Sequence, residues 1–356
     1  MGRGKRKKNR QARRQCSGNL HDRPEQNAPQ NEEAFPSPGS ILTPQAIMAE
    51  LDKSIIGQQA AKQAVAIALW KQQLRAQGDT TVPRSNLLLY GPSGCGKTAL
   101  VQEAAKIAGL PFIAYDATTL SETGYRGNDA QDMVFKLHLC HSGHQKLKYG
   151  VIFVDEIDKL AGKGNDTRAA YNRGTQHSLL KLVEGMEIET DEGTVNTADL
   201  LFIFGGAFTA LQREKEQARC KAKPIGFLRE KEDEAANESS AVTLDDFIHY
   251  GMEPELMGRM GLQIALQQLT AAELKEILLN SRLSLYRQYQ AFFLRNGSQL
   301  HFTNARLDEL ADQALALGTG ARALNALVEE AVEPLLLYLA AGKLQHRERV
   351  QMNHVG

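Results

Sequence analysis

The sequence predicts an α/β fold: a parallel five-stranded sheet flanked by helices, followed by a small, mainly helical C-terminal domain. Two observations lead to this fold class. Five short apolar runs alternate with helical patterns, and such runs are typical of parallel strands that are buried on both faces. After Leu269 the pattern becomes wholly helical, which predicts the second, smaller domain.

The sheet is expected to use five strands, at residues 86–90, 112–115, 151–155, 200–204 and 262–266. Helical patterns lie between these runs, so the connections should cover both faces of the sheet. Two helices precede the first strand, at 44–51 and 58–77. The first should begin at Thr43, because a threonine N-cap followed by Pro44 is typical of a helix start.

The C-terminal helices are expected at 270–289, 304–317 and 321–341. Thr270 is a helix cap, and Asn296-Gly297 and Gly318 indicate turns. These patterns predict four parts in the chain: a disordered basic tail at 1–40, a large domain at 41–268, a small α-rich domain at 269–345 and a tail at 346–356.

Composition excludes several classes of protein. With 42% hydrophobic and 24% charged residues, a chain of 356 residues can bury two ordinary cores. Its 42 basic and 42 acidic residues argue against a body that coats nucleic acid. The four cysteines form no C-x-x-C pair, and no apolar run is long enough to cross a membrane. We therefore expect a cytoplasmic protein without a membrane partner.

A phosphate-binding loop directly follows the first expected strand and opens a helix. Its residues are Gly91, Pro92, Ser93, Gly94, Cys95, Gly96, Lys97 and Thr98, with Ala99 next along the helix. Glycines let backbone N–H groups face the phosphates, Lys97 reaches their terminal oxygens, and the Thr98 hydroxyl ligates Mg²⁺. The loop therefore predicts ATP and Mg²⁺ as ligands.

Two adjacent acids, Asp155 and Glu156, end the third strand after four apolar residues. Ligands in open parallel sheets bind at the carboxyl ends of the strands. Asp155 is therefore expected to hold Mg²⁺ through water, and Glu156 to polarise the water that attacks the γ-phosphate. Asp158 and Lys159 are interpreted as an exposed turn.

Two arginines lie far downstream, where the domains should meet. Arg259 precedes the last strand, and Arg322 opens a helix of the small domain. Phosphoryl transfer needs cations opposite the developing charge, and arginine supplies them in a fixed fork. An isolated arginine more often makes a surface salt bridge, so the residues alone leave both roles open.

Together the phosphate loop, the acidic strand end, Ile56-Gly57-Gln58 and both arginine contexts resemble the ClpX and HslU family of AAA+ unfoldases. The resemblance covers about residues 43–341. It implies that Ile55, Ile56 and Gly57 contact the adenine and that Arg322 acts on the nucleotide of its own subunit. It also implies that Arg259 acts on a neighbour's nucleotide, and hence a homo-hexameric ring.

Gly124-Tyr125-Arg126-Gly127 is similar to the family's pore loop, in which an aromatic residue between glycines grips a translocating polypeptide. The family usually has an aliphatic residue where Arg126 stands, which predicts a more electropositive pore. As a lone motif such a segment is more often a turn.

Ile225-Gly226-Phe227 is similar to the loop by which ClpX docks on its ClpP peptidase, and lies in an expected flexible loop at 213–241. Exposed apolar residues on a loop suggest a partner pocket. A loop folded back on its own domain is the alternative interpretation. No protease nucleophile stands in a recognisable context, so any proteolysis must come from a separate peptidase.

Three departures from the family are visible. The sequence has no paired-cysteine zinc domain ahead of the ATPase, the segment 184–200 lacks the basic Arg-Lys-His loop of ClpX, and 127–151 is too short for the inserted domain of HslU. In addition, Gly205-Gly206 stands where many AAA+ proteins place a polar sensor, and that role is left unassigned.

The sequence thus predicts an ATP-dependent unfoldase that translocates polypeptide substrates, with a ClpP-type peptidase as a possible partner. A remodelling chaperone that works without a peptidase is the first alternative. A motor stimulated by nucleic acid is the second, suggested only by the basic residues of the tail.

Overall fold

The computed structural model describes residues 41–120, 130–140, 149–162, 164, 167–190, 193–221, 242–341 and 349–352. All of them belong to one contact unit, Pro38–Gly356. Predictions that fall on other residues, including the basic tail, lie outside the described part.

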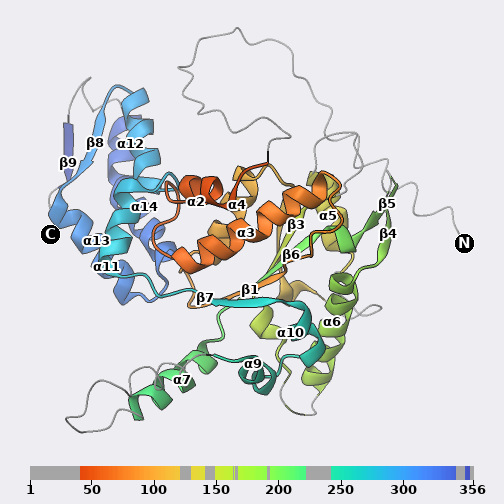
Figure 1. Cartoon of the computed structure of the whole chain (residues 1–356). Helices are drawn as coiled ribbons and strands as arrows, with labels where there is room; N and C mark the ends of the chain where they lie inside the picture. The colour runs from red at the N-terminus through yellow and green to blue at the C-terminus, as the bar shows by residue number, and fades with distance from the viewer. Residues whose placement is uncertain are drawn as a thin grey trace, which may run out of the picture. The chain divides into compact units, whose positions relative to one another are not determined.

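A five-stranded parallel sheet forms the centre of the fold, as predicted (Figure 1). Its order is β2-β3-β6-β1-β7. The strands are β1 (Leu87–Tyr90), β2 (Phe112–Asp116), β3 (Val151–Asp155), β6 (Leu201–Gly206) and β7 (Leu262–Ala265). Since β1 lies between β6 and β7, the loop that follows β1 begins inside the sheet rather than at its edge.

Both faces of the sheet are buried, which explains the continuous apolar runs of the sequence. Side chains alternate along β1: Leu88 and Tyr90 join one core cluster, while Leu87 and Leu89 join another. Figure 1 shows three helices over one face: α2 (Pro44–Leu51), α3 (Gln59–Ala76) and α4 (Lys97–Ile107). The other cluster includes residues of α5 (Asp132–Cys140), α6 (Thr167–Glu184), α9 (Leu244–Tyr250) and α10 (Pro254–Arg259).

Helix α2 begins where the sequence predicts. The Thr43 side chain accepts a hydrogen bond from the backbone N–H of Ala46, and Pro44 occupies the first turn. A proline costs nothing at this place, because the first N–H groups of a helix have no partner within the helix.

The residues from Leu269 onward pack around an apolar core of their own. The elements are α11 (Ala271–Asn280), α12 (Leu285–Arg295), β8 (Gln299–Phe302), α13 (Asn304–Ala316), α14 (Ala321–Ala340) and β9 (Arg349–Met352). This confirms a mainly helical C-terminal part, while the exact domain bounds stay a prediction.

One predicted helix, 270–289, is wrong: the structure divides it into α11 and α12. The break lies at serines. The Ser284 side chain accepts from the Arg287 N–H and donates to the Leu278 carbonyl, and the Ser281 hydroxyl donates to the Ser54 carbonyl. Serine hydroxyls that bond to backbone groups compete with the helix, so these residues end one helix and cap the next.

The wholly helical pattern predicted after Leu269 is also wrong, because β8 pairs in parallel with β9. Burial alternates along β8, with Leu300 and Phe302 buried between more exposed neighbours. The sequence shows the same alternation of polar and apolar residues, and this pattern could have predicted the strand. A second unpredicted feature is the antiparallel hairpin of β4 (Glu187–Thr190) and β5 (Gly193–Asn196), which occupies the segment after α6.

Candidate nucleotide site

The predicted phosphate loop connects β1 to α4. Gly94 and Gly96 have φ of +75° and +99°, in the left-handed region that glycine adopts without strain. Gly94 also lies directly against the backbone of Thr319, so a side chain there would collide with the chain that leads into α14. The two glycines therefore let the loop turn and let the C-terminal part approach it.

Lys97 is buried at the start of α4. Its Nζ donates to the carbonyl of Gly91 at 2.7 Å and to that of Pro92 at 3.0 Å. A buried ammonium needs such acceptors, and the loop's own carbonyls supply them. Phosphate oxygens could replace these carbonyls, since they lie along the same loop.

Cys95 is also buried, and this burial raises the pKa of its thiol. Its Sγ lies 3.9 Å from Nζ of Lys97. The raised pKa keeps the sulfur in the thiol form, so Cys95 fills space under the loop without adding charge.

The acids predicted from β3 meet the loop. The Thr98 hydroxyl donates to Oδ2 of Asp155 at 2.7 Å, and Oδ1 of Asp155 accepts from the N–H of Glu156 at 2.9 Å. Glu156 has φ +57°, a left-handed conformation that is strained for a residue with a side chain. Such strain is common in active sites, and here it accompanies the residue predicted to activate water.

The oxygen atoms at this site fit a Mg²⁺ ion that would take most of its ligands from phosphates and water. In the part of the chain that the structure describes, no group of three or more His, Cys, Asp or Glu side chains could hold a metal. Mg²⁺ commonly uses only one or two protein ligands besides phosphates and water. The hydrogen-bonded side-chain oxygens of Thr98 and Asp155 match that pattern.

A cavity of about 590 Å³ is lined by Lys97, Thr98, Asp155 and Glu156, whereas Cys95 is not part of its lining. Its lining comes from four parts of the chain. They are the phosphate loop and the start of α4 (Ser93, Gly94 and residues 96–99), the end of β3 (Asp155 and Glu156), the segment after β6 (Ala207 and Thr209), and α14 (Ala321, Arg322 and Asn325). Small-molecule sites typically have volumes of about 300 to 1,000 Å³.

Arg322 reaches the phosphate loop from the C-terminal part. Its Nη1 donates to the Ser93 hydroxyl at 3.4 Å, and the neighbouring Ala321 N–H donates to the Gly94 carbonyl at 3.1 Å. The structure thus places the guanidinium at the cavity of its own chain, where the resemblance puts it.

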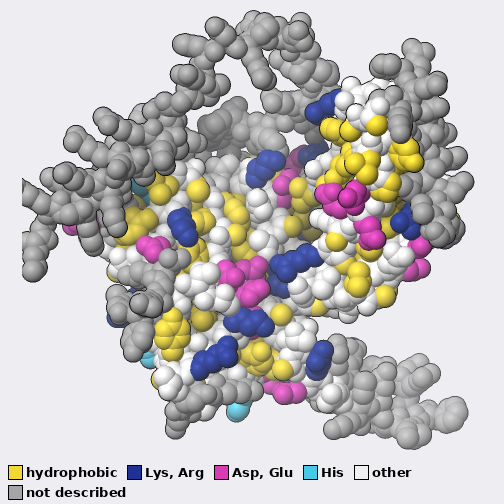
Figure 2. Space-filling view, turned by 180° about the vertical axis from the view of Figure 1, so that it is seen from behind, with side chains coloured by type: hydrophobic (Ala, Val, Ile, Leu, Met, Phe, Trp, Pro, Cys, Tyr) yellow, Lys and Arg dark blue, Asp and Glu magenta, His cyan; other side chains and the backbone are white. Residues whose placement is uncertain are grey.

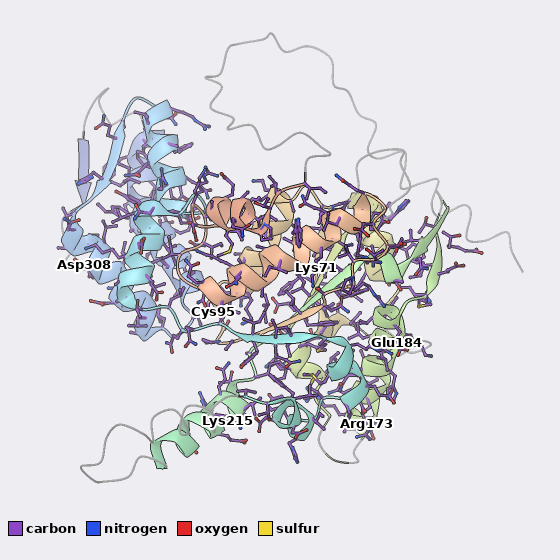
Figure 3. All side chains as sticks on the ribbon, in the orientation of Figure 1. Lys71, Cys95, Arg173, Glu184, Lys215 and Asp308 are labelled. Atoms are coloured by element: carbon purple, nitrogen blue, oxygen red, sulfur yellow. The ribbon has the colours of Figure 1, made fainter. Side chains whose placement is uncertain are left out.

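Arg259 lies elsewhere. Its guanidinium pairs with Glu184, and it lines a separate cavity near the start of β1. Figure 3 labels Cys95 and Glu184, which lie toward opposite ends of β1. The structure therefore does not bring Arg259 to the nucleotide cavity of its own chain.

The predicted adenine contacts Ile55, Ile56 and Gly57 are not part of the lining of the 590 Å³ cavity. Ile55 belongs to the apolar core under α4, and Gly57 has φ +69° with the Glu273 carboxylate against it. The adjacent Gln58 uses both ends of its amide on Gln267: Nε2 donates to the carbonyl at 2.8 Å, and Oε1 accepts from the N–H at 3.0 Å. Adenine contact stays a prediction.

The interpretation of Asp158 as part of an exposed turn is wrong. Asp158 is 6% exposed, in a short 3-10 helix at Ile157–Leu160, and its Oδ1 accepts from the Ala207 N–H at 3.0 Å. The turn after β6 covers it. Lys159 is exposed, as expected.

Gly205 lies within β6 and faces side chains of the neighbouring strand β3. A side chain there would lie 2.5 Å from the Phe153 ring and 2.9 Å from Oδ1 of Asp155. The close approach of Phe153 and Asp155 therefore requires glycine at this position.

Two predicted sites lie outside the described residues: the pore loop Gly124–Gly127 and the docking residues Ile225, Gly226 and Phe227. Residues 213–221, at the start of the expected docking loop, are helical instead and continue α7 (Thr209–Lys221).

Comparison with known proteins identifies the family. A family described as "AAA domain (Cdc48 subfamily)" matches residues 82–262, which is about half of the chain. The chain belongs to the AAA+ family of ATPases. A second match, to the C-terminal, D2-small domain of ClpB protein, covers residues 269–352 of this AAA+ chain.

Curated relatives place this AAA+ protein closer to one group. Proteins named "ATP-dependent Clp protease ATP-binding subunit ClpX" are 36% identical over 316 residues in Treponema denticola and 38% identical over 322 residues in Azotobacter vinelandii. Each match covers 82% of this chain, and 76% and 73% of the respective relative. The predicted resemblance to ClpX is therefore confirmed, and so is the prediction of an ATP-hydrolysing enzyme.

None of the helices in the described ranges is both long and apolar enough to span a membrane.

Proposed function

We propose that the protein is an ATP-dependent protein unfoldase that works as a homo-hexameric ring and moves polypeptide through its centre. One observation carries the proposal. The nucleotide cavity holds a phosphate loop, a candidate base and one arginine, whereas Arg259 lies at another surface of the same chain. An arginine at this position can contact the phosphates of a nucleotide only if that nucleotide is bound by another copy of the chain.

The chemistry would begin with Lys97, which exchanges the carbonyls of its own loop for phosphate oxygens. Thr98 and Asp155 would hold Mg²⁺, which neutralises charge on the phosphates. Glu156 would orient the attacking water and accept its proton, while Arg322 would fix the triphosphate from the same chain.

Arg259 of a neighbouring copy would then stabilise the charge that develops as the γ-phosphoryl group leaves. Because this guanidinium must come from outside, hydrolysis depends on the interface between copies. Each turnover can therefore be coupled to a change in that interface, which is what a mechanical enzyme requires.

Exposed apolar side chains support an assembly. Figure 2 shows hydrophobic side chains gathered over the C-terminal helices. Of the large hydrophobic side chains exposed in the described part, most belong to these helices and their turns: Leu279, Leu283, Phe292, Leu294, Leu315, Leu317, Leu337 and Tyr338. Apolar patches of this kind mark interaction surfaces.

Polypeptide handling is assigned to Tyr125, on the basis of the sequence motif. The test measures unfolding of a stable fluorescent protein that carries an unstructured tail, in the presence of ATP. Tyr125→Ala should abolish unfolding and keep ATP hydrolysis, whereas Tyr125→Phe, which keeps the aromatic face, should retain both. Loss of ATP hydrolysis together with unfolding would contradict a gripping role.

Delivery to a ClpP-type peptidase is the second part of the proposal, and the relatives' name supports it. Phe227→Ala should abolish degradation of a tagged substrate while ATP hydrolysis and unfolding stay intact. If the wild-type chain unfolds substrates but no peptidase degrades them, the remodelling chaperone becomes the better description.

Oligomeric state is tested directly by electron microscopy of Glu156→Gln with ATP. The variant should bind ATP without completing hydrolysis, so six-membered rings should accumulate. Particles of single protomers under these conditions would overturn the proposal.

A further inference from the structure

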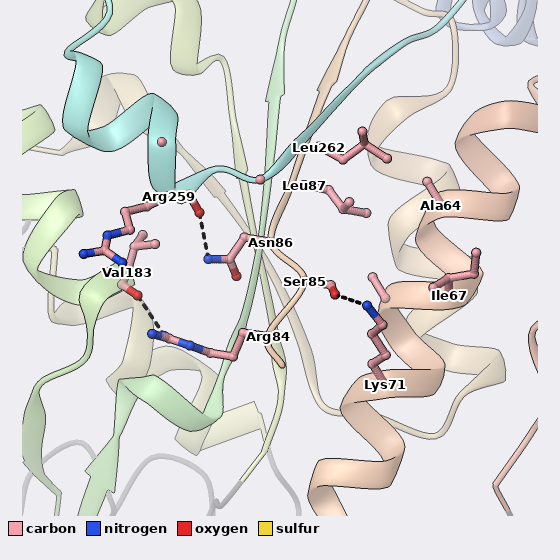
Figure 4. A pocket seen from close by; sticks show the side chains of 13 residues that line it. Ala64, Ile67, Lys71, Arg84, Ser85, Asn86, Leu87, Val183, Arg259 and Leu262 are labelled. Atoms are coloured by element: carbon pink, nitrogen blue, oxygen red, sulfur yellow. Dashed lines mark hydrogen bonds between the residues drawn. The ribbon is translucent and has the colours of Figure 1, made fainter. Parts of the chain in front are cut away.

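Arg259 lies at the rim of a groove of about 470 Å³ beside the edge strand β7 (Figure 4). Three basic side chains line it, Lys71, Arg84 and Arg259, together with apolar side chains that include Leu262. Leu262 is 62% exposed, so the groove opens at the free edge of the sheet.

The main chain of Arg259 is firmly held. Asn86 donates through Nδ2 to the Arg259 carbonyl at 3.0 Å, and its Oδ1 accepts from the Phe202 N–H at 3.2 Å. Gly261, with φ +69°, lies so close to the Asn86 carbonyl that a side chain would not fit. These contacts tie the arginine backbone to the centre of the sheet, so only its side chain is free to change partner.

Within the described residues, that side chain has one partner. Nη2 of Arg259 lies 3.1 Å from Oε1 of Glu184, and no other carboxylate in the described ranges makes an ion pair with it. The side chains are 57% and 45% exposed. Exposed pairs are weak, so the guanidinium can leave this carboxylate at small cost.

The helix end that carries Glu184 is itself anchored. Arg84 donates through Nη1 to the Val183 carbonyl at 2.8 Å (Figure 4). Its Nη2 donates to the Glu184 carbonyl at 3.0 Å. Both carbonyls belong to the last turn of α6, where backbone acceptors lack partners within the helix. Arg84 therefore fixes the position from which the carboxylate meets Arg259.

Cations outnumber carboxylates around this pair. Burial, together with the nearby cations Arg75 and Arg259, lowers the pKa of Arg84. Among the residues that the structure describes, two carboxylates pair with them: Asp199 with Arg75 at 3.4 Å, and Glu184 with Arg259. The surroundings therefore favour a further anion.

We infer that Glu184 is a positioning residue that occupies the Arg259 guanidinium within one protomer and gives it up to the phosphates of a neighbouring copy's ATP. This inference rests on the proposed role of Arg259 between copies. A triphosphate carries more charge than one carboxylate and meets a site with excess cations, so it wins the exchange. Glu184 then sets how readily the arginine becomes available.

The test compares ATP hydrolysis by the full-length wild type and by Glu184→Gln. Glutamine keeps the size of the side chain and removes its charge, so the arginine is released more easily. An exposed pair changes an equilibrium constant by up to about fivefold, and kcat/KM should rise by about two- to fivefold. A value equal to or below that of the wild type would overturn the inference.

Two variants control for general effects. Glu187→Gln makes the same chemical change at an exposed residue three positions along the chain, and should leave kcat/KM unchanged. Glu184→Asp keeps the charge and should behave more like the wild type than Glu184→Gln does. A structural role for Glu184 would instead lower activity in every variant at that position.

Ionic strength gives an independent readout. Salt screens an exposed ion pair, so the difference between wild type and Glu184→Gln should shrink as salt is raised. A difference that is independent of salt would contradict an electrostatic competition.

The variant Arg259→Ala distinguishes a failure of the proposed role of Arg259 from a failure of the inference about Glu184. If Arg259→Ala hydrolyses ATP as fast as the wild type, the proposed role of Arg259 fails. If Arg259→Ala is inactive while Glu184→Gln behaves as the wild type, only the inference about Glu184 fails.

Discussion

The nucleotide cavity and the Arg259 groove differ in how their charges are balanced. In the cavity, Lys97 and Arg322 face the acids Asp155 and Glu156, and all of them come from one chain. The groove is lined by the basic side chains of Lys71, Arg84 and Arg259, and by no carboxylate of the described residues. The first region is equipped for a phosphate ligand with its metal, and the second for an anion that its own chain does not supply. The four predictions below test this division.

The largest effect is expected at Arg259. Arginines that act on a transferring phosphoryl group contribute about 10³-fold or more to kcat, so Arg259→Ala should lose nearly all ATP hydrolysis. ATP binding, measured with a fluorescent analogue, should remain, because the cavity keeps all its residues.

Mixing variants decides whether this arginine acts between copies. Arg259→Ala and Glu156→Gln are each inactive alone, but a mixed ring contains sites with an intact base in one copy and an intact arginine in the next. About a quarter of the sites should recover if the two mix at random in head-to-tail rings. Absence of recovery would mean that the arginine acts within its own chain.

The next effect in size concerns Glu156. Removal of a general base commonly costs about 10²- to 10⁴-fold, so Glu156→Gln should reduce kcat in that range while the affinity for ATP changes little. Glu189→Gln, an exposed acid on β4, is the matched control. A reduced affinity for ATP would indicate that Glu156 contributes to binding instead.

A smaller effect is expected at Arg322, which contacts the loop of its own chain. Loss of one charged contact to phosphate should weaken ATP binding by about tenfold, measured by titration calorimetry. Mixing with another variant should not rescue Arg322→Ala, in contrast to Arg259→Ala. Rescue would erase the distinction between the two regions.

The smallest effect compares two glycines, one in each region. Gly205→Ala would press a methyl group against Phe153 and Asp155, and overpacking of this kind costs about 1 to 3 kcal/mol. Gly258→Ala, in α10 beside the groove, meets nothing within 4 Å and should leave the free energy of unfolding unchanged or slightly raised. Denaturant unfolding of both variants measures the difference.

Local patterns of the sequence predicted much of the fold and of the nucleotide site. The five strands, the phosphate loop and the acids of β3 are each encoded within about ten neighbouring residues, as apolar runs, glycine spacing or capping residues. Lys97 and Thr98 lie together because β1, the phosphate loop and α4 follow one another directly. Asp155 reaches Thr98 from β3, because the carboxyl ends of parallel strands lie at the same edge of the sheet.

The features that the sequence did not reveal depend on residues far apart in the chain. The Arg259–Glu184 pair spans 75 positions, and the Asn86–Arg259 bond spans 173. Asp158 is buried by the turn that carries Ala207, 49 positions later. No local pattern marks such contacts, because each of these residues would also be ordinary at a surface.

The double hydrogen bond of Gln58 to the backbone of Gln267 has a mechanical consequence. Gln267 lies on the short link between β7 and α11, so this amide joins the start of α3 to the only described stretch of chain that runs from the sheet into the C-terminal helices. A side chain that grips one peptide by both its donor and its acceptor resists twisting as well as stretching. Any ligand that shifts residues 55–57 would therefore also rotate this link, without contacting the C-terminal helices directly.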